Sequence, residues 1–264
     1  MLSNTKFTPV WRSLMFVPVN VERYVSKAHT RGADAIQLDV EDSVAIADKP
    51  AARKLIQEAA ESVSQAGADV VVRINQPLRM AIPDLEESIS PRVKAIAVTK
   101  VDGPGHIRLL SEAIDELESE RGMDVGHTKL IAMVETAAGF LRIENIAKAH
   151  PRVVAMSLGS EDFATSIGTD PVAEVLTYPK QQGIIAARAA GIIPLGLIGT
   201  VADYQDIDAM RETIRRSRRF GFQGASCVHP KIVGLLNDEF RPTPQEVGNA
   251  KKIIAAFEEA VAAG

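Results

Sequence analysis

The stretch Lys129-Leu-Ile-Ala-Met-Val-Glu-Thr136 decides the fold of this chain. It begins with a short apolar run, which is the length of a strand rather than of a core helix. An acidic residue and a threonine follow the run at once. The stretch Ala35-Ile-Gln-Leu-Asp39, continued by Val40-Glu-Asp42, has the same pattern earlier in the chain. Both stretches therefore predict buried strands of a parallel sheet whose carboxyl ends carry acidic side chains.

The same pattern recurs along the chain on both sides of these stretches: an apolar run, a polar turn, then a helical segment. The predicted strands are Ser13–Pro18, Ala35–Asp39, Val70–Asn75, Ala95–Thr99, Lys129–Val134, Val153–Ser157, Ile192–Ile198 and Ala225–Val228. Apolar spacing of three and four residues predicts helices between them, for example Ala51–Ala66, Ile107–Glu120 and Ile207–Phe220. Strands that alternate with helices indicate βαβ units and a parallel sheet.

Eight strands with eight following helices predict a closed (β/α)8 TIM barrel, an α/β fold that typically needs about 250 residues. We expect one domain over residues 1–264, with Pro244–Ala263 as the last helix. The alternative is an open doubly wound sheet, which usually has a glycine-rich phosphate loop after its first strand. Here the first strand ends in Pro18-Val-Asn20, so the barrel is favoured.

The composition excludes several classes of protein. A net charge of −4 gives no basic field for nucleic acid. The single cysteine, Cys227, permits no internal disulfide, and its apolar surroundings indicate a buried, inert thiol. No stretch approaches 18 uninterrupted apolar residues, and Met1–Val10 lacks the apolar core of a signal peptide. We therefore expect a cytoplasmic protein without a membrane partner.

Acidic side chains dominate the predicted carboxyl ends of the strands, where TIM barrels carry their chemistry. These ends hold Asp39, Glu41 and Asp42, then Arg73 and Asn75, then Thr99 and Lys100, then Glu135, then Glu161 and Asp162, and finally His229. Carboxylates without a histidine–cysteine cluster suit Mg²⁺, which needs only one or two protein carboxylates. Glu135 and Asp162 follow adjacent strands and are the predicted pair. Arg73 is then available for a substrate carboxylate.

Each of these residues also has a structural interpretation. Glu135 and Asp162 can serve as acidic residues at helix N-termini. The three acids after the second strand can form a salt-bridge network with Lys49 and Arg53, and Arg73 can pair with one of them. Lys100 fits an ordinary ion pair better than a Schiff base. His229 fits a hydrogen-bonded barrel residue better than an acid/base group.

The chain resembles the citrate lyase beta subunit family, within the HpcH/HpaI aldolase and malyl-CoA lyase superfamily. The resemblance covers nearly the whole chain in family order, and it is specific as a set although each string alone is weak. The strings are Arg12-Ser-Leu-Met-Phe-Val-Pro18, Ala33-Asp-Ala-Ile-Gln-Leu-Asp-Val-Glu-Asp-Ser43, Asp48-Lys49, Ala52-Arg53, Val72-Arg-Ile-Asn75, Lys129 to Gly139, Leu158-Gly-Ser-Glu-Asp-Phe163, Ala186-Ala-Arg-Ala-Ala-Gly191 and Gly221 to Pro230.

The resemblance implies a magnesium-dependent lyase that cleaves a 3-hydroxy-acyl thioester of the citryl-, citramalyl- or malyl-CoA type. Glu135 and Asp162 fall on the metal ligands, and Glu135 is also expected beside the bound substrate. Arg73 falls on the position that binds the substrate carboxylate. The catalytic acidic cluster is Asp39, Glu41 and Asp42, while Arg23 and Lys27 fall on positions that some members use for coenzyme A phosphates.

The chain departs from the family pattern in ways that keep rival functions open. It has Val19 and Thr99 where the family usually has glycine and proline, and Leu195-Gly196 where the family often has Ile-Asp. Longer relatives continue into a lid with an acid/base aspartate, for which Ala263-Gly264 leaves no counterpart, so a lidless barrel is expected. The rivals are a magnesium aldolase acting on free 2-oxo acids, a malyl-CoA thioesterase, and a beta subunit that acts only in a complex with an acyl carrier protein. A homotrimer or hexamer is expected.

Overall fold

The structure is a computed structural model that describes residues 9–199 and 205–263. Its described residues form one sheet of eight parallel strands. The strands are β1 (Ser13–Pro18), β2 (Ala35–Asp39), β3 (Asp69–Ile74), β4 (Val93–Val98), β5 (Lys129–Val134), β6 (Val153–Leu158), β7 (Ile193–Leu195) and β8 (Ala225–Cys227).

Helices follow the strands along the chain and form the outer layer. The described helices are α1 (Glu22–Ala28), η1 (His29–Arg31), η2 (Ile46–Asp48), α2 (Lys49–Arg53), α3 (Ile56–Val63), α4 (Leu78–Ser88), α5 (Pro104–Glu120), α6 (Ala137–Phe140), α7 (Ile143–Ala147), α8 (Ser160–Ile167), α9 (Ala173–Ala189), α10 (Ile207–Phe220), α11 (Lys231–Phe240) and α12 (Pro244–Ala263).

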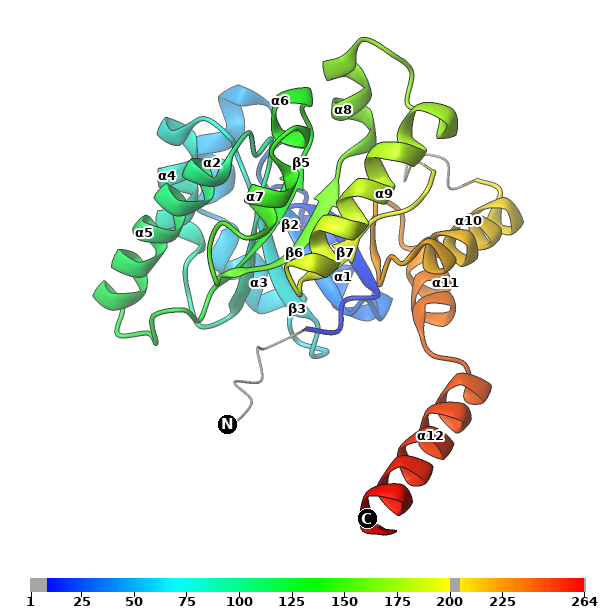
Figure 1. The fold of residues 1–264 in the computed structure, drawn as a ribbon. Coiled ribbons are helices and arrows are strands. Elements are labelled where there is room, and N and C mark those ends of the chain that lie inside the picture. The colour runs from blue at the N-terminus through cyan, green and yellow to red at the C-terminus, as the bar shows by residue number, and fades with distance from the viewer. Residues whose placement is uncertain (1–8, 200–204, 264) are drawn as a thin grey trace.

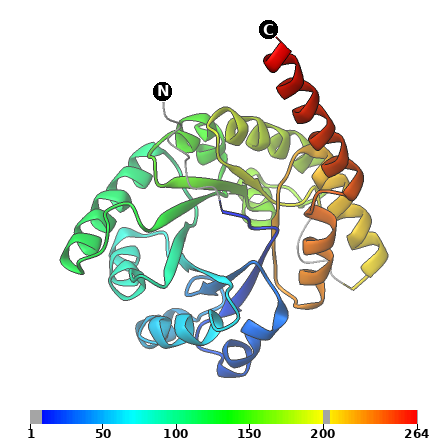
Figure 2. The ribbon, with the colours of Figure 1, turned by 90° about the horizontal axis from the view of Figure 1, so that it is seen from below.

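The sheet closes into a barrel, as the sequence predicts. The strands pair in the order β7-β6-β5-β4-β3-β2-β1-β8, all parallel where they are paired. A parallel bridge between Leu195 and Gly224 joins the two end strands, supported by the Gly196 N–H donating to the Gly224 carbonyl at 2.8 Å. Seen along the barrel axis, the helices surround the ring of strands (Figure 2).

Alternating side chains on each strand divide the core into two layers, because successive side chains point to opposite faces of a sheet. The layer between strands and helices includes Ile36, Val72 and Ala132. The layer inside the barrel consists of Trp11, Leu14, Ala35, Val71, Ala95, Ala97, Ile131, Met133, Val154, Ala155, Ile193 and Leu195. This alternation determines which side chain at the carboxyl end of each strand points into the mouth of the barrel.

The predicted strands are confirmed to within a few residues, and the largest shortening is at β7. This strand has three residues rather than the predicted seven, because Gly196 adopts φ +146, a conformation that ends the strand. The predicted helix over residues 51–66 is instead two helices, α2 and α3, separated by Lys54 and Leu55. The helices predicted over residues 207–220 and 244–263 have the expected bounds.

The helix α12 stands away from the barrel in both views (Figures 1 and 2). Its first turn is tied to α10 by an ion pair between Glu246 and Arg218, 2.8 Å from oxygen to nitrogen. Among the helices of residues 9–199 and 205–263, none combines the length and apolarity required to cross a membrane.

Candidate active site

Three polar side chains continue the inward-facing positions of their strands at the carboxyl end of the barrel. On β2 the inward series that begins at Ala35 reaches Asp39, and on β3 the series through Val71 reaches Arg73. On β5, Ile131 and Met133 point inward, and Glu135 follows two residues later. A period of two therefore places all three at the mouth of the barrel, where enzymes of this fold act.

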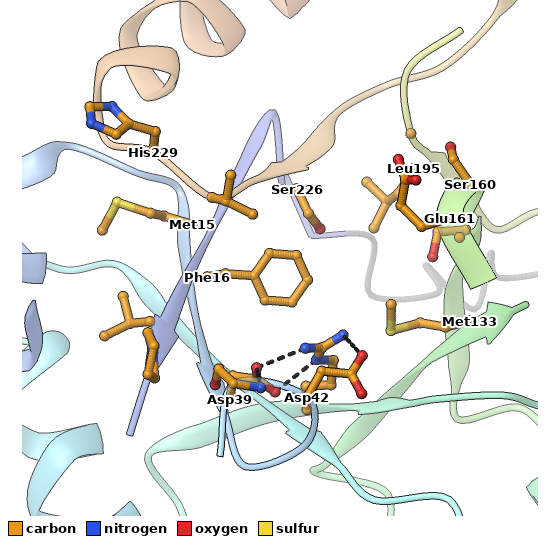
Figure 3. Close-up of a pocket in the computed structure, with 18 of the residues that line it drawn as sticks. Met15, Phe16, Asp39, Asp42, Met133, Ser160, Glu161, Leu195, Ser226 and His229 are labelled. Atoms are coloured by element: carbon orange, nitrogen blue, oxygen red, sulfur yellow. Dashed lines mark hydrogen bonds and ion pairs between the residues drawn. The ribbon is translucent and has the colours of Figure 1, made fainter. Parts of the chain in front are cut away.

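A cavity of about 790 Å³ opens at this end of the barrel. Asp39, Asp42, Arg73, Glu135 and Asp162 all line it. Figure 3 shows Phe16 in the middle of the cavity, with Asp39 and Asp42 on one side and Ser160, Glu161 and Met133 on another. The remaining wall includes Leu195, Ser226 and His229. Its size suits a small-molecule ligand.

Arg73 is held by the acids of β2 and the loop after it. Asp39 and Arg73 are register partners on adjacent strands, and Arg73 Nε and Nη2 donate to the two carboxylate oxygens of Asp39, both at 2.7 Å. Burial alone would raise the pKa of Asp39, but these bonds hold it below its ordinary value. Arg73 Nη1 lies 3.2 Å from Glu41, and the guanidinium packs over the Phe16 ring. The predicted structural pairing of Arg73 with an acid is thus confirmed.

Lys100 joins the second strand's acids to the proposed metal ligands. Its ammonium lies 2.5 Å from Glu41 and 3.0 Å from Asp162. Its backbone N–H donates to Glu135 Oε2 at 2.8 Å. Lys100 has φ +49, and within the described residues no other residue except glycine has a positive φ. Such strain typically persists where surrounding contacts require it. Lys100 forms ion pairs, as expected, and it is also the residue around which Glu135 and Asp162 gather.

Glu135 is the more deeply buried acid of the predicted metal pair, with 4% of the residue exposed. Burial raises the pKa of its carboxyl group to about 7, although the hydrogen bond from the Lys100 N–H lowers that pKa. The interpretation of Glu135 as a helix cap is wrong, because Thr136 caps α6 by accepting from the Gly139 N–H at 3.0 Å. Asp162 lies in the first turn of α8, as its structural interpretation expects, and its carboxylate also reaches Lys100.

Gly159 lies against the Glu135 carboxylate, a contact that the sequence did not single out. A Cβ at this residue would lie 2.6 Å from Glu135 Oε1 and 2.7 Å from Glu135 Cγ. Those separations are shorter than a van der Waals contact, so a side chain at position 159 would displace the Glu135 carboxylate. The signal was available in the string Leu158-Gly-Ser-Glu-Asp162, where the glycine directly precedes the acidic helix.

Carboxylates outnumber cations in the ion-pair network inside the basic rim. The carboxylates of Asp39, Glu41, Asp42, Glu135 and Asp162 contact two cationic residues, Arg73 and Lys100. A divalent cation would offset most of that excess, and oxygen donors are what Mg²⁺ prefers. Within residues 9–199 and 205–263 no cluster of three or more histidine, cysteine or acidic residues is arranged to hold a metal. The oxygen donors Glu135 and Asp162 are of the type that Mg²⁺ prefers, and one or two protein carboxylates suffice for it.

The predicted coenzyme A positions lie at the rim of the cavity. Arg23 and Lys27 are exposed on α1, one turn apart, and Arg31 extends the same basic edge. Arg23 is stacked over the neighbouring Tyr24 ring at 4.7 Å and donates to its hydroxyl at 3.1 Å. The rim of the cavity is thus basic, whereas its floor is acidic.

The predicted network of Lys49 and Arg53 with the β2 acids is wrong in its partners. The Lys49 ammonium donates to the backbone carbonyls of Val40 and Glu41, while Arg53 pairs with Asp84 on α4. Lys49 thus supports the loop after β2, whereas Arg53 ties α2 to α4. His229 accepts the Lys231 N–H at 3.2 Å, as a hydrogen-bonded barrel residue would. Cys227 is buried, as expected, and burial raises the pKa of its thiol to about 12, which disfavours the reactive thiolate.

Comparisons with known proteins agree with this architecture. Residues 12–230 match the family described as HpcH/HpaI aldolase/citrate lyase. The chain is 34% identical over 255 residues to citrate lyase subunit beta of Leuconostoc mesenteroides subsp. cremoris, which covers 94% of this chain and 83% of the relative. It is 33% identical over 276 residues to the L-malyl-CoA/beta-methylmalyl-CoA lyase of Rhodobacter capsulatus, and this alignment covers 96% of this chain and 86% of the relative. It also superposes on protein CitE from Mycobacterium tuberculosis, solved with magnesium, acetoacetate and coenzyme A, with a TM-score of 0.72, 25% identity, and coverage of 96% and 88%.

The fold and the site define a (β/α)8-barrel enzyme with an acidic centre at the carboxyl ends of its strands. The chain belongs to the HpcH/HpaI aldolase/citrate lyase family. The expectation that it is a carbon–carbon lyase is confirmed at the level of this family.

Proposed function

We propose that this chain is a magnesium-dependent lyase that cleaves a 3-hydroxy-acyl thioester of the citryl-, citramalyl- or malyl-CoA type. The products would be an acyl-CoA and a 2-oxo acid. The observation that carries the proposal is the meeting of Glu135 and Asp162 around Lys100 in a cavity with a basic rim. Support among the relatives comes from the L-malyl-CoA/beta-methylmalyl-CoA lyase, whose name states that substrate class.

Glu135 and Asp162 would hold the metal. When bound, Mg²⁺ supplies Lewis-acid stabilisation of the oxygens on which negative charge develops. The burial of Glu135 and the closeness of Gly159 fix one carboxylate, while Asp162, which is half-exposed, leaves room for water and substrate. One fixed carboxylate and one that is half-exposed suit a Mg²⁺ ion that keeps several of its water ligands.

Arg73 would anchor a carboxylate of the substrate. Asp39 occupies its Nε–Nη2 edge and Glu41 lies 3.2 Å from Nη1, so the substrate would be held through the remaining N–H groups of Nη1 and Nη2. The Asp39 pair and the Phe16 ring hold the guanidinium plane in place before substrate arrives. Such prior orientation is worth more in the transition state than a flexible contact would be.

The bond that breaks joins the carbon next to the thioester to the carbon that bears the hydroxyl group. The hydroxyl loses its proton and becomes the carbonyl of the 2-oxo acid, while the bonding electrons pass to the thioester enolate, which then takes a proton on carbon. Asp42 is the acid/base residue we assign, because it lines the cavity and its side chain is 59% exposed. Glu41 is held more closely by Arg73 and Lys100, at 3.2 and 2.5 Å, than Asp42 is, at 3.5 and 3.7 Å. Positioned proton transfer typically contributes about 10²–10⁴-fold.

The rim residues Arg23 and Lys27 would receive the phosphates of coenzyme A, with Arg31 on the same edge. Three cations along one face of α1 and η1 present a positive potential beside the acidic floor. The thioester end would then point toward Glu135 and Asp162, which lie on the inner wall.

A mass-spectrometric screen of acyl-CoAs tests the proposal. The chain is incubated with citryl-, citramalyl- and malyl-CoA in the presence of Mg²⁺ or of EDTA. We expect an acyl-CoA and a 2-oxo acid to appear together, and only with Mg²⁺. Release of free coenzyme A without a 2-oxo acid would mean a thioesterase. Cleavage of the free acids, independent of coenzyme A, would mean an aldolase.

A further inference from the structure

The helix α9 carries a lysine on its buried face. Leu176, Lys180 and Ile184 are spaced four residues apart, so they lie along one side of the helix, and all three are buried. Lys180 is only 2% exposed. A lysine is rarely buried to this extent, because an ammonium group that leaves water without a partner loses much free energy. The partners of this ammonium group therefore indicate its role.

The Lys180 ammonium group binds backbone carbonyls rather than a carboxylate. Its Nζ donates to the Ile198 carbonyl at 3.2 Å and to the Gly199 carbonyl at 2.7 Å. In the described part of the chain it forms no ion pair, and Glu161 of α8 is the charged side chain that favours its charged form. Burial lowers the pKa of Lys180 to about 8, although Glu161 raises that pKa. The contact thus joins a buried cation to two backbone dipoles.

Residues 196–199 continue from β7 into the wall of the cavity, and we call them the β7 wall. Most of this segment lines the cavity, at Gly196, Leu197 and Gly199. Figure 3 shows Leu195, the last residue of β7, on the same side of the cavity as Glu161. The position of this backbone therefore shapes the space that a substrate would occupy.

Buried side chains from two helices hold the β7 wall. Lys180 of α9 binds its last two carbonyls, and Ser217 Oγ of α10 accepts the Ile198 N–H at 2.9 Å. The Ser217 hydroxyl donates in turn to the Thr213 carbonyl at 2.6 Å. Hydrogen bonds from a charged donor are roughly twice as strong as those between neutral groups. Lys180 is therefore the stronger of the two supports.

We propose that Lys180 is a positioning residue, which uses its charge to hold the β7 wall in place beside the bound substrate. Its role in turnover rests on the proposed function, whereas its hold on the β7 wall does not. Lys180 does not line the cavity, so it acts through the backbone of Ile198 and Gly199. A displacement of about 1 Å in a positioning group can cost about 10²-fold in rate.

Hydrogen–deuterium exchange of the full chain at pH 7, measured by mass spectrometry, tests the hold on the β7 wall. Residues 196–199 should exchange at least about tenfold faster in Lys180→Met than in wild type, because methionine cannot make the charge-assisted hydrogen bonds. Lys180→Arg keeps the charge and should restore protection. Ser217→Ala removes the second support and should also speed exchange. The matched control is Lys148→Met, which replaces an exposed lysine directly after α7 and should exchange as wild type does.

The pH profile of turnover, measured with malyl-CoA and Mg²⁺, tests the role of the charge. Lys180→Met should lower kcat/KM about 10²-fold at pH 7. In wild type, kcat/KM should fall about threefold or more as the pH rises through about 8, because a neutral amine donates weaker hydrogen bonds than an ammonium group. Lys180→Arg should not show this fall, since its guanidinium stays protonated. Ser217→Ala should show the same fall as wild type, because it retains Lys180.

The proposal is overturned if Lys180→Met leaves the exchange of the β7 wall unchanged, or if it speeds exchange equally throughout the barrel. It is also overturned if Lys180→Arg loses kcat/KM with pH as wild type does, a comparison that decides the matter even where Lys180→Met does not fold. A wild-type chain that shows the expected exchange pattern without cleaving malyl-CoA would support the hold of Lys180 on the β7 wall and count against the proposed function instead.

Discussion

Replacing Glu135 by glutamine should stabilise the metal-free protein at alkaline pH. Glu135 lies on the inner wall with one carboxylate oxygen bound to the Lys100 N–H. Burial raises its pKa from 4.5 to about 7. Because the folded-state pKa is raised, the fold loses stability as the pH rises from the unfolded-state pKa through the folded-state pKa. Glutamine keeps the shape and can accept the same hydrogen bond without carrying the charge.

The size of the effect follows from the pKa shift. The rise from 4.5 to about 7 corresponds to about 3 kcal/mol of folding free energy at pH 8, an upper bound because neighbouring charges relax. Near pH 4 the carboxyl group is protonated in both states, so Glu135→Gln and wild type should be equally stable. The difference in stability should therefore grow from about pH 4.5 to about pH 7 and favour the variant.

Urea denaturation in EDTA at pH 5 and pH 8, followed by circular dichroism, measures this difference. The control is Glu120→Gln, which removes an exposed carboxylate at the end of α5 and should have no pH-dependent effect of comparable size. Wild type that is as stable as Glu135→Gln at pH 8, with both variants folded, would refute the reasoning. It would mean that the surroundings of Glu135 do not disfavour its charge.

Three further changes test the parts of the site that surround this carboxylate. Gly159→Ala should lower Mg²⁺ affinity at least about tenfold in calorimetry, because its Cβ would lie 2.6 Å from Glu135 Oε1. Gly105→Ala, with open space around its Cβ, is the control. Equal Mg²⁺ affinities of Gly159→Ala and wild type would exclude the steric account. Arg73→Lys should reduce kcat/KM for a carboxylate substrate about 100-fold, since it loses the planar fork. The same change should lower the free energy of unfolding by about 1–2 kcal/mol, because the buried Asp39 loses its bidentate partner; a variant that is silent in both measurements would remove Arg73 from the account. Asp42→Asn should lower kcat about 10²–10⁴-fold with KM little changed, and retention of full turnover would assign proton transfer elsewhere.

Much of the barrel was predictable from the sequence because parallel strands buried on both faces have a strong local pattern. The runs at Lys129–Val134 and Ala35–Asp39 gave strands with the predicted bounds. The period of two then carried Asp39, Arg73 and Glu135 to the same mouth. Where local pattern was weaker, the bounds shifted: β7 is shortened at Gly196, and α2 separates from α3 at Lys54 and Leu55.

The partners of charged residues were less predictable, because ion pairs depend on the loops between elements. Sequence proximity suggested Lys49 and Arg53 as partners of the β2 acids, but the partners are Arg73 and Lys100 from the next two strands. The left-handed conformation of Lys100, which brings its N–H to Glu135, has no local signature. The contact of Gly159 with Glu135 depends on how the β6–α8 turn passes β5, which a single sequence does not display.

Isothermal titration of the chain with Mg²⁺ tests the central claim most directly. The account predicts one ion bound per wild-type chain, with binding abolished in both Glu135→Ala and Asp162→Ala while their circular dichroism spectra stay native. Asp102→Ala, at an exposed position after β4, is the control and should bind as wild type does. Unchanged Mg²⁺ affinity in the Glu135 and Asp162 variants would contradict the account, because the ion would then be held elsewhere.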